Sequence, residues 1–133
     1  FTQVDNEKFE LANKWLRLQN RNISILQGLR NKGITKIIIY GASEFALRLI
    51  EQCENENNVV KIIGIGDKKI SSKSGDYKNL PYLTIDDIAL LKMENMCVVI
   101  TAMGFCEEIR SELRKRGISK IISLKEMVNE VFC

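Results

Sequence analysis

The sequence predicts an α/β fold in which helices cover both sides of a short parallel sheet. The first support is a series of apolar runs at 36–40, 59–65 and 96–101, the second of which lacks the polar alternation of a half-exposed strand. The second is the helical spacing of apolar residues between these runs, and the third is the shortness of the connections. We expect a three-layer, doubly wound domain with strand order 3-2-1-4-5.

The beginning of the chain has the pattern of helices, from about Asn6 to Lys32. We therefore divide the chain into an N-terminal helical segment, 1–33, and a sheet-containing domain, 34–133. Asn22 is placed to cap a second helix within the first segment. Gly33 is placed to end that helix in the left-handed conformation.

One stripe of the first helix is apolar and comprises Phe9, Ala12, Trp15 and Leu16. Tryptophan is enriched in interfaces, and this helix lies outside the unit that the first two strands form. We therefore expect the stripe to pack on a second subunit or on a neighbouring domain. The sequence leaves open the alternative that the helix folds back on its own sheet.

Local signals place the later elements. The helix after 36–40 carries four inward apolar residues: Ala46, Leu49, Ile50 and Cys53. A Ser or Thr followed three residues later by an acid predicts capping boxes at Thr84–Asp87 and Ser123–Glu126. Residues 80–83 are expected to be extended, and 120–122 to form the last strand.

The sequence of 29–38 is nearly repeated at 113–122. The two copies lie too far apart for a solenoid repeat. We interpret them as the same helix-to-strand corner used twice, with Gly33 and Gly117 as the residues that end the helices.

The composition excludes several classes of protein. The chain has 133 residues, 45% of them hydrophobic, and a net charge of +3, which is too small and too scattered to indicate a nucleic-acid partner. No apolar run is as long as a membrane span requires. There is no histidine, and the four cysteines form no CxxC pair, so we expect no metal site and no disulfide framework. We expect small core cysteines in a reducing compartment. Because the chain begins at Phe1 without a signal-peptide pattern, we expect a fragment of a larger cytoplasmic protein.

The turn after the first strand resembles a degenerate Gly-x-Gly-x-x-Gly fingerprint, with Gly41, Ser43 and Ala46 at the three positions. Ser43 places a Cβ where a diphosphate approaches the backbone. Its hydroxyl can hydrogen-bond a phosphate, or it can simply cap the helix. We expect the nucleotide-contacting residues to be those of the turn and the start of the helix: Gly41, Ala42, Ser43, Glu44 and Phe45.

An acid at the end of the second strand strengthens this hypothesis. Asp67 stands where a ribose is held in nucleotide-binding βαβ units, and Lys68 after it can meet a phosphate. As alternatives, Asp67 can be an ordinary turn residue and Lys68 a solvated one. Thr101 follows another strand at the same expected edge and is a further candidate, unless 101–104 is only a connecting turn.

No catalytic constellation is present in the sequence. None of Tyr40, Tyr77 and Tyr82 has a Lys four residues later, and without histidine no Ser–His or Cys–His dyad is possible. A methyltransferase would be expected to have an acid and a richer glycine loop around Gly41. We therefore expect a binding domain rather than a complete enzyme.

Residues 37–50, 59–69 and 80–88 resemble the Rossmann-type segments of bacterial surface-polysaccharide proteins. Such segments occur ahead of sugar-modifying acyltransferases and of nucleotide-sugar epimerases and dehydratases. The matching positions are Gly41, Ala46, Gly64, Asp67 and Pro81, with Arg48 near the basic position of the pattern. Ser43 and Asn79 depart from it, each where the pattern has Gly. The similarity covers about 34–133.

The resemblance implies a UDP-sugar or NAD(P) as ligand and a role in cell-surface glycan synthesis. We expect a nucleotide-sugar- or NAD(P)-binding domain of such a protein. The alternative is a domain that has kept the fold without the ligand and serves assembly or regulation through its N-terminal helices.

Overall fold

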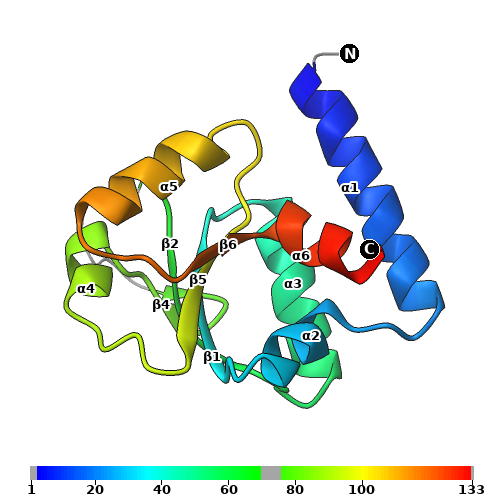
Figure 1. Ribbon diagram of the computed structural model, residues 1–133, viewed down its shortest axis with the longest axis horizontal. Coiled ribbons are helices and arrows are strands. Elements are labelled where there is room, and N and C mark those ends of the chain that lie inside the picture. The colour runs from blue at the N-terminus through cyan, green and yellow to red at the C-terminus, as the bar shows by residue number, and fades with distance from the viewer. Residues whose placement is uncertain (1–2, 70–75, 133) are drawn as a thin grey trace.

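The computed structural model describes residues 3–69 and 76–132 and has the predicted α/β class. Its main sheet is four-stranded and all-parallel, in the order β2-β1-β5-β6 (Figure 1). The strands of this sheet are β1 (Lys36–Tyr40), β2 (Lys61–Gly66), β5 (Met96–Ile100) and β6 (Ile121–Ser123). The helices are α1 (Gln3–Asn20), α2 (Ile25–Asn31), α3 (Glu44–Asn55), α4 (Ile85–Ala89), α5 (Cys106–Lys115) and α6 (Leu124–Phe132).

The expected strand order 3-2-1-4-5 is wrong, because the segment 80–83 does not join the sheet as a strand. β4 (Leu80–Pro81) pairs instead with β3 (Asp76–Tyr77) in a small antiparallel ribbon. Tyr82 alone makes a parallel bridge to Ile65 of β2, and the Leu83 N–H donates to the Ile65 carbonyl at 2.9 Å. Pro81 has no N–H to donate to a neighbouring strand, and helix α4 begins directly after Thr84. The segment 80–83 therefore makes no continuous pairing with β2.

Alternate residues of the strands enter two separate cores. Ile37 and Ile39 of β1 pack with buried residues of α1, α2, α3 and α6, whereas Ile38 and Tyr40 pack with those of α4 and α5. Figure 1 shows the same division, with the two groups of helices on opposite sides of the sheet. This alternation follows from the two-residue period of a strand, and it gives the domain three layers.

Helix α1 buries a different face from the predicted stripe. Leu11, Trp15 and Leu18 are buried, while Phe9 is 72% exposed and Leu16 is 54% exposed. The Trp15 Nε1–H donates to Gln52 Oε1 of α3 at 2.7 Å, and its ring stacks on that of Phe45 at a centroid distance of 6.4 Å. Trp15 therefore packs within its own chain, and the predicted grouping of Trp15 with Phe9 and Leu16 is wrong.

The second helix is capped by Ser24, and not by Asn22 as predicted. The Ser24 Oγ accepts from the Gln27 N–H at 3.0 Å. Asn22 instead has φ of 58°, a left-handed conformation that Asn tolerates better than most residues, and it lies in the turn that follows α1.

The two repeated corners have the same structure, as predicted. Ile34 N–H donates to the Leu29 carbonyl, and Ile118 N–H donates to the Leu113 carbonyl, each at 3.1 Å. Gly33 and Gly117 have φ of 85° and 86°, so both corners need the left-handed conformation that glycine adopts freely.

Both predicted capping boxes are also confirmed. Thr84 and Asp87 exchange side-chain-to-backbone hydrogen bonds at 3.1 and 2.9 Å. Ser123 and Glu126 do the same at 3.0 Å in each direction.

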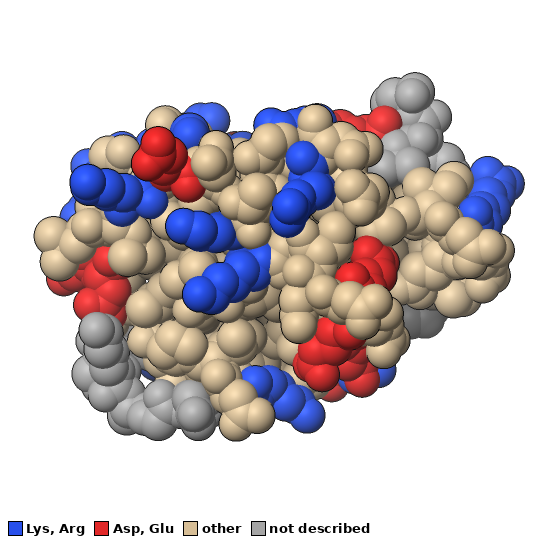
Figure 2. Space-filling view, turned by 90° about the horizontal axis from the view of Figure 1, so that it is seen from below, with Lys and Arg blue, Asp and Glu red and all other residues tan. Residues whose placement is uncertain are grey.

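On the face shown in Figure 2, Lys and Arg side chains are spread out, with uncharged surface and acidic groups between them. In the described part of the chain, no helix is both long and apolar enough to cross a membrane.

Cys97 supplies a test of the buried β5 strand. Burial raises the pKa of its thiol from 9.0 to about 12, so the unfolded thiol ionises well before the folded one. The free energy of unfolding therefore has a Cys97 contribution that is complete below pH 9. Between pH 9 and 12 that contribution should fall by about 1.4 kcal/mol per pH unit.

Urea denaturation of the wild type and of Cys97→Ala at a series of pH values measures this contribution, because Tyr40 and the other groups titrate in both proteins. The wild type should lose stability more steeply above pH 9. Parallel profiles would show that Cys97 is not buried as described.

Candidate functional site

The candidate site lies where β1, β2 and β5 end, at the carboxyl edge of the sheet. The chain passes from β1 to β2 on one side and from there to β5 on the other, so the boundary between β1 and β5 is the switch point of the sheet. Gly41, Asp67 and Thr101 are joined here by hydrogen bonds among their loops, as the sequence predicts.

Asp67 holds the loop after β1 against the end of β2. Its Oδ2 accepts from the Ala42 N–H at 2.7 Å, and its Oδ1 accepts from the Lys69 N–H at 2.9 Å. The second bond is that of an ordinary Asp turn, which the sequence left open as an alternative. A carboxylate offers about four acceptor positions, so the half-buried Asp67 can still accept hydroxyl groups.

Gly41 is packed tightly against the loop that follows β5. A Cβ at this position would lie 2.7 Å from the Ala102 nitrogen and 2.8 Å from Thr101 Oγ1, and the residue has φ of 123°. The fully buried Thr101 donates from its hydroxyl to the Gly41 carbonyl at 2.7 Å. Thr101 therefore positions the turn, and its side chain presents no surface to a ligand.

Ser43 precedes helix α3 without capping it. It is exposed, and its side chain makes no cap hydrogen bond. Of the two roles that the sequence left open for this hydroxyl, capping is therefore not realised. Phe105, at the start of α5, makes no side-chain cap either. By contrast, Ser24, Thr84 and Ser123 cap α2, α4 and α6.

The acids at the starts of α3 and α5 all have cationic neighbours. Glu44 lies 3.7 Å from Arg48, and Glu108 lies 3.4 Å from Lys68. The Lys68 Nζ also lies 5.7 Å from the centroid of the Phe105 ring, so Lys68 reaches from the end of β2 to the start of α5. Phe45 faces elsewhere, since its ring stacks on Trp15.

Two hollows flank these loops and contain residues that the sequence reasoning missed. One, of about 340 Å³, joins Asp67 and Lys68 to Tyr40, Thr84 and Arg116. Burial raises the pKa of Tyr40 to about 12, with further contributions from Glu112 and Asp67, so its hydroxyl stays protonated. Arg116 belongs to the repeated corner sequence, and no spacing pattern links it to Asp67.

The second hollow, of about 500 Å³, lies beyond the ends of β5 and β6 and is lined by Cys106, Arg110 and Glu126, among others. Burial alone would raise the pKa of Glu126, but hydrogen bonds from Ser123 and Arg110 bring it below its ordinary value. Burial raises the pKa of Cys106 despite the neighbouring Arg110, so this thiol is not an activated nucleophile.

The cysteines and acids of the described residues lack the grouping that a metal ion requires. Within residues 3–69 and 76–132, no three Cys, Asp or Glu side chains are grouped so as to hold a metal ion. The described cysteines, Cys53, Cys97 and Cys106, are free thiols.

The packing at Gly41 predicts a large loss of stability on adding one methyl group. Gly41→Ala should lower the free energy of unfolding by at least about 2 kcal/mol, because the new Cβ meets backbone and the φ is unfavourable for alanine. Gly28→Ala is the matched control, since the residue is inside α2 and, apart from its chain neighbours and its own helix backbone, no atom lies within 4 Å of a Cβ there. That change should stabilise by about 0.5–1 kcal/mol. Equal effects of the two substitutions in urea denaturation would contradict the tight contact.

Comparison of the chain with protein-family models, with curated proteins and with solved structures found no significant match.

Proposed function

We propose that the chain is a Rossmann-like domain that binds a nucleotide-type ligand, NAD(P) or a nucleotide sugar such as a UDP-sugar, at the boundary between β1 and β5. The observation that carries this proposal is the lack of side-chain caps on α3 and α5, the two helices that begin on either side of that boundary. Free N–H groups at a helix start, together with the helix dipole, suit a phosphate.

The residues divide into two roles under this proposal. The first N–H groups of α3 contact phosphate, and Lys68, which lies beside Glu108 at the start of α5, offsets its charge. Asp67 accepts the ribose hydroxyls with the acceptor positions that Ala42 and Lys69 leave open. Thr101 keeps the Gly41 turn in place and makes no ligand contact.

The wider setting follows from the resemblance in 34–133. We propose that the domain serves bacterial cell-surface glycan synthesis in the cytoplasm, as part of a protein related to the epimerase, dehydratase or acyltransferase type. We assign the reaction itself to other parts of such a protein, because the sequence has no histidine for a Ser–His or Cys–His dyad and no Tyr-x-x-x-Lys pair.

Calorimetry with NAD, NADP, UDP and UDP-N-acetylhexosamine tests the proposal. At least one of the four should bind. Asp67→Asn should lower the affinity for that ligand by about ten- to a hundredfold, since a charge-assisted hydrogen bond is lost while the side chain keeps its size. Ser43→Gly should tighten it, because the backbone can then approach the diphosphate more closely.

Ser119→Gly is the matched control, since Ser119 is also exposed but lies in the corner between α5 and β6, at the opposite edge of the sheet. It should leave the affinity unchanged. If none of the four compounds binds even to the Ser43→Gly protein, the site is vestigial.

A second candidate function is then the better one: an assembly or regulatory module without a ligand. Its specific support is the exposed apolar surface of α1, where Phe9 and Leu16 are both more than half exposed.

A further inference from the structure

The smaller hollow beside the candidate site contains a buried hydroxyl group without a hydrogen-bond partner. This hollow, of about 340 Å³, is lined by Tyr40, Asp67, Ile85, Glu112 and Arg116, among others. Tyr40 is 3% exposed, and its hydroxyl makes no hydrogen bond within residues 3–69 and 76–132. Buried tyrosine hydroxyls usually have a partner. The unused hydroxyl therefore indicates that a ligand group enters the hollow.

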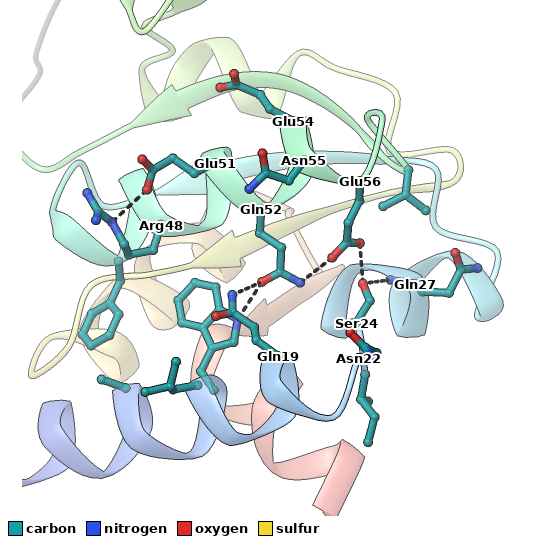
Figure 3. A pocket seen from close by; sticks show the side chains of 16 residues that line it. Gln19, Asn22, Ser24, Gln27, Arg48, Glu51, Gln52, Glu54, Asn55 and Glu56 are labelled. Atoms are coloured by element: carbon teal, nitrogen blue, oxygen red, sulfur yellow. Dashed lines mark hydrogen bonds and ion pairs between the residues drawn. The ribbon is translucent and has the colours of Figure 1, made fainter.

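The groove between α1, α2 and α3 shows the opposite case. It has a volume of about 1330 Å³, and its floor is polar. There Gln52 accepts from Gln19 and donates to Glu56, which also accepts from Ser24 (Figure 3). These polar groups are bonded to one another and need no ligand. The hydroxyl of Tyr40 has no such internal partner.

The charges closest to the Tyr40 hydroxyl are negative. Burial raises the pKa of Tyr40 to about 12, and the carboxylates of Glu112 and Asp67 add to this shift. In the described part of the chain, neither carboxylate is paired with a basic side chain. A ligand group at the inner end of the hollow is therefore favoured if it donates hydrogen bonds, and disfavoured if it only accepts them.

The cations of the hollow are paired with other acids. Lys68 lies 3.4 Å from Glu108, and Arg116 forms an ion pair with Asp86. The side chains of Arg116 and Asp86 are 47% and 72% exposed, so this pair lies at the rim. The unpaired acids consequently decide which group is favoured at the inner end.

We propose that the hollow holds the adenine of an adenine nucleotide, whose amino group donates to Glu112 and to the Tyr40 hydroxyl oxygen. The inference rests on the proposed nucleotide site, and it selects NAD(P) over a UDP-sugar there. Because a base is attached directly to its ribose, a ribose held by Asp67 brings the base to the hollow that Asp67 also lines. The half-buried Ile85 adds an apolar contact for the ring.

The amino group is what distinguishes adenine from uracil in this environment. It carries two N–H donors, which match the acceptors that Glu112 and Tyr40 offer. Uracil presents mainly carbonyl oxygens, which the two unpaired carboxylates repel.

Calorimetry with ADP and inosine diphosphate tests the proposal, because the base of the second ligand has an oxo group in place of the amino group. ADP should bind about tenfold more tightly than inosine diphosphate or UDP, since only the amino group suits both acceptors. In Glu112→Gln the preference over inosine diphosphate should disappear. A neutral amide donates to an oxo group as readily as it accepts from an amino group.

Tyr40→Phe removes the hydroxyl and keeps the ring. It should lower the affinity for ADP by about three- to tenfold and leave that for ribose 5-phosphate, which has no base, unchanged. A disturbance of the fold would weaken both ligands. Tyr82→Phe is the matched control, since Tyr82 packs with the core on the other side of the sheet. For the charge change, the control is Glu94→Gln, at an exposed position in the turn before β5. Neither control should alter the affinity for ADP.

Equal affinities of the wild type for ADP and inosine diphosphate overturn the inference and leave the nucleotide site standing. So does a preference for ADP that survives Glu112→Gln, or a Tyr40→Phe protein that binds ADP as the wild type does. If none of the nucleotides binds, the proposed function fails together with the inference.

Discussion

The contact between Gly41 and the loop after β5 is the constraint on which the candidate site depends. Only a residue without Cβ allows the Ala102 backbone and the Thr101 hydroxyl to come so close to the end of β1. The Thr101–Gly41 hydrogen bond then fixes the turn, and the Asp67–Ala42 bond ties the same turn to β2. Three loops that are distant in the sequence are thus joined to one another at the carboxyl edge of the sheet. Helices α3 and α5 begin directly after two of these loops, so their starts lie on either side of the β1–β5 boundary.

The same groups that would recognise a nucleotide also hold the domain together. Asp67 accepts two hydrogen bonds from backbone N–H groups, and Lys68 contacts both Glu108 and the Phe105 ring. A fold can therefore keep Gly41 and Asp67 for their structural contacts alone. Ser43 is different, because its exposed side chain makes no cap hydrogen bond. Its substitution consequently separates ligand binding from folding more cleanly than a change at Gly41 does.

Most features that depend on neighbouring residues in the sequence could be predicted from it, although the cap of α2 is Ser24 and not the predicted Asn22. The capping boxes at Thr84 and Ser123 and the corners at Gly33 and Gly117 need only residues within one turn, and all four have the expected structure. Features that depend on distant partners could not. The buried face of α1 depends on two residues of α3. Gln52 accepts a hydrogen bond from Trp15, and the ring of Phe45 stacks on the Trp15 ring. The role of Thr101 is set by Gly41, 60 residues away. At the candidate site, the sequence indicated where the residues meet, whereas the bonds already made among them became visible only in three dimensions.

The most direct measurement is an amide NMR titration of the chain with the ligand that binds best, or with UDP if affinities are weak. We expect the amides of 43–46 and 105–108 to shift together along one binding curve, because both helix starts would face the same phosphate. Saturable shifts confined to the groove between α1 and α3, or no saturable shift at all, would contradict a nucleotide site at the boundary between β1 and β5.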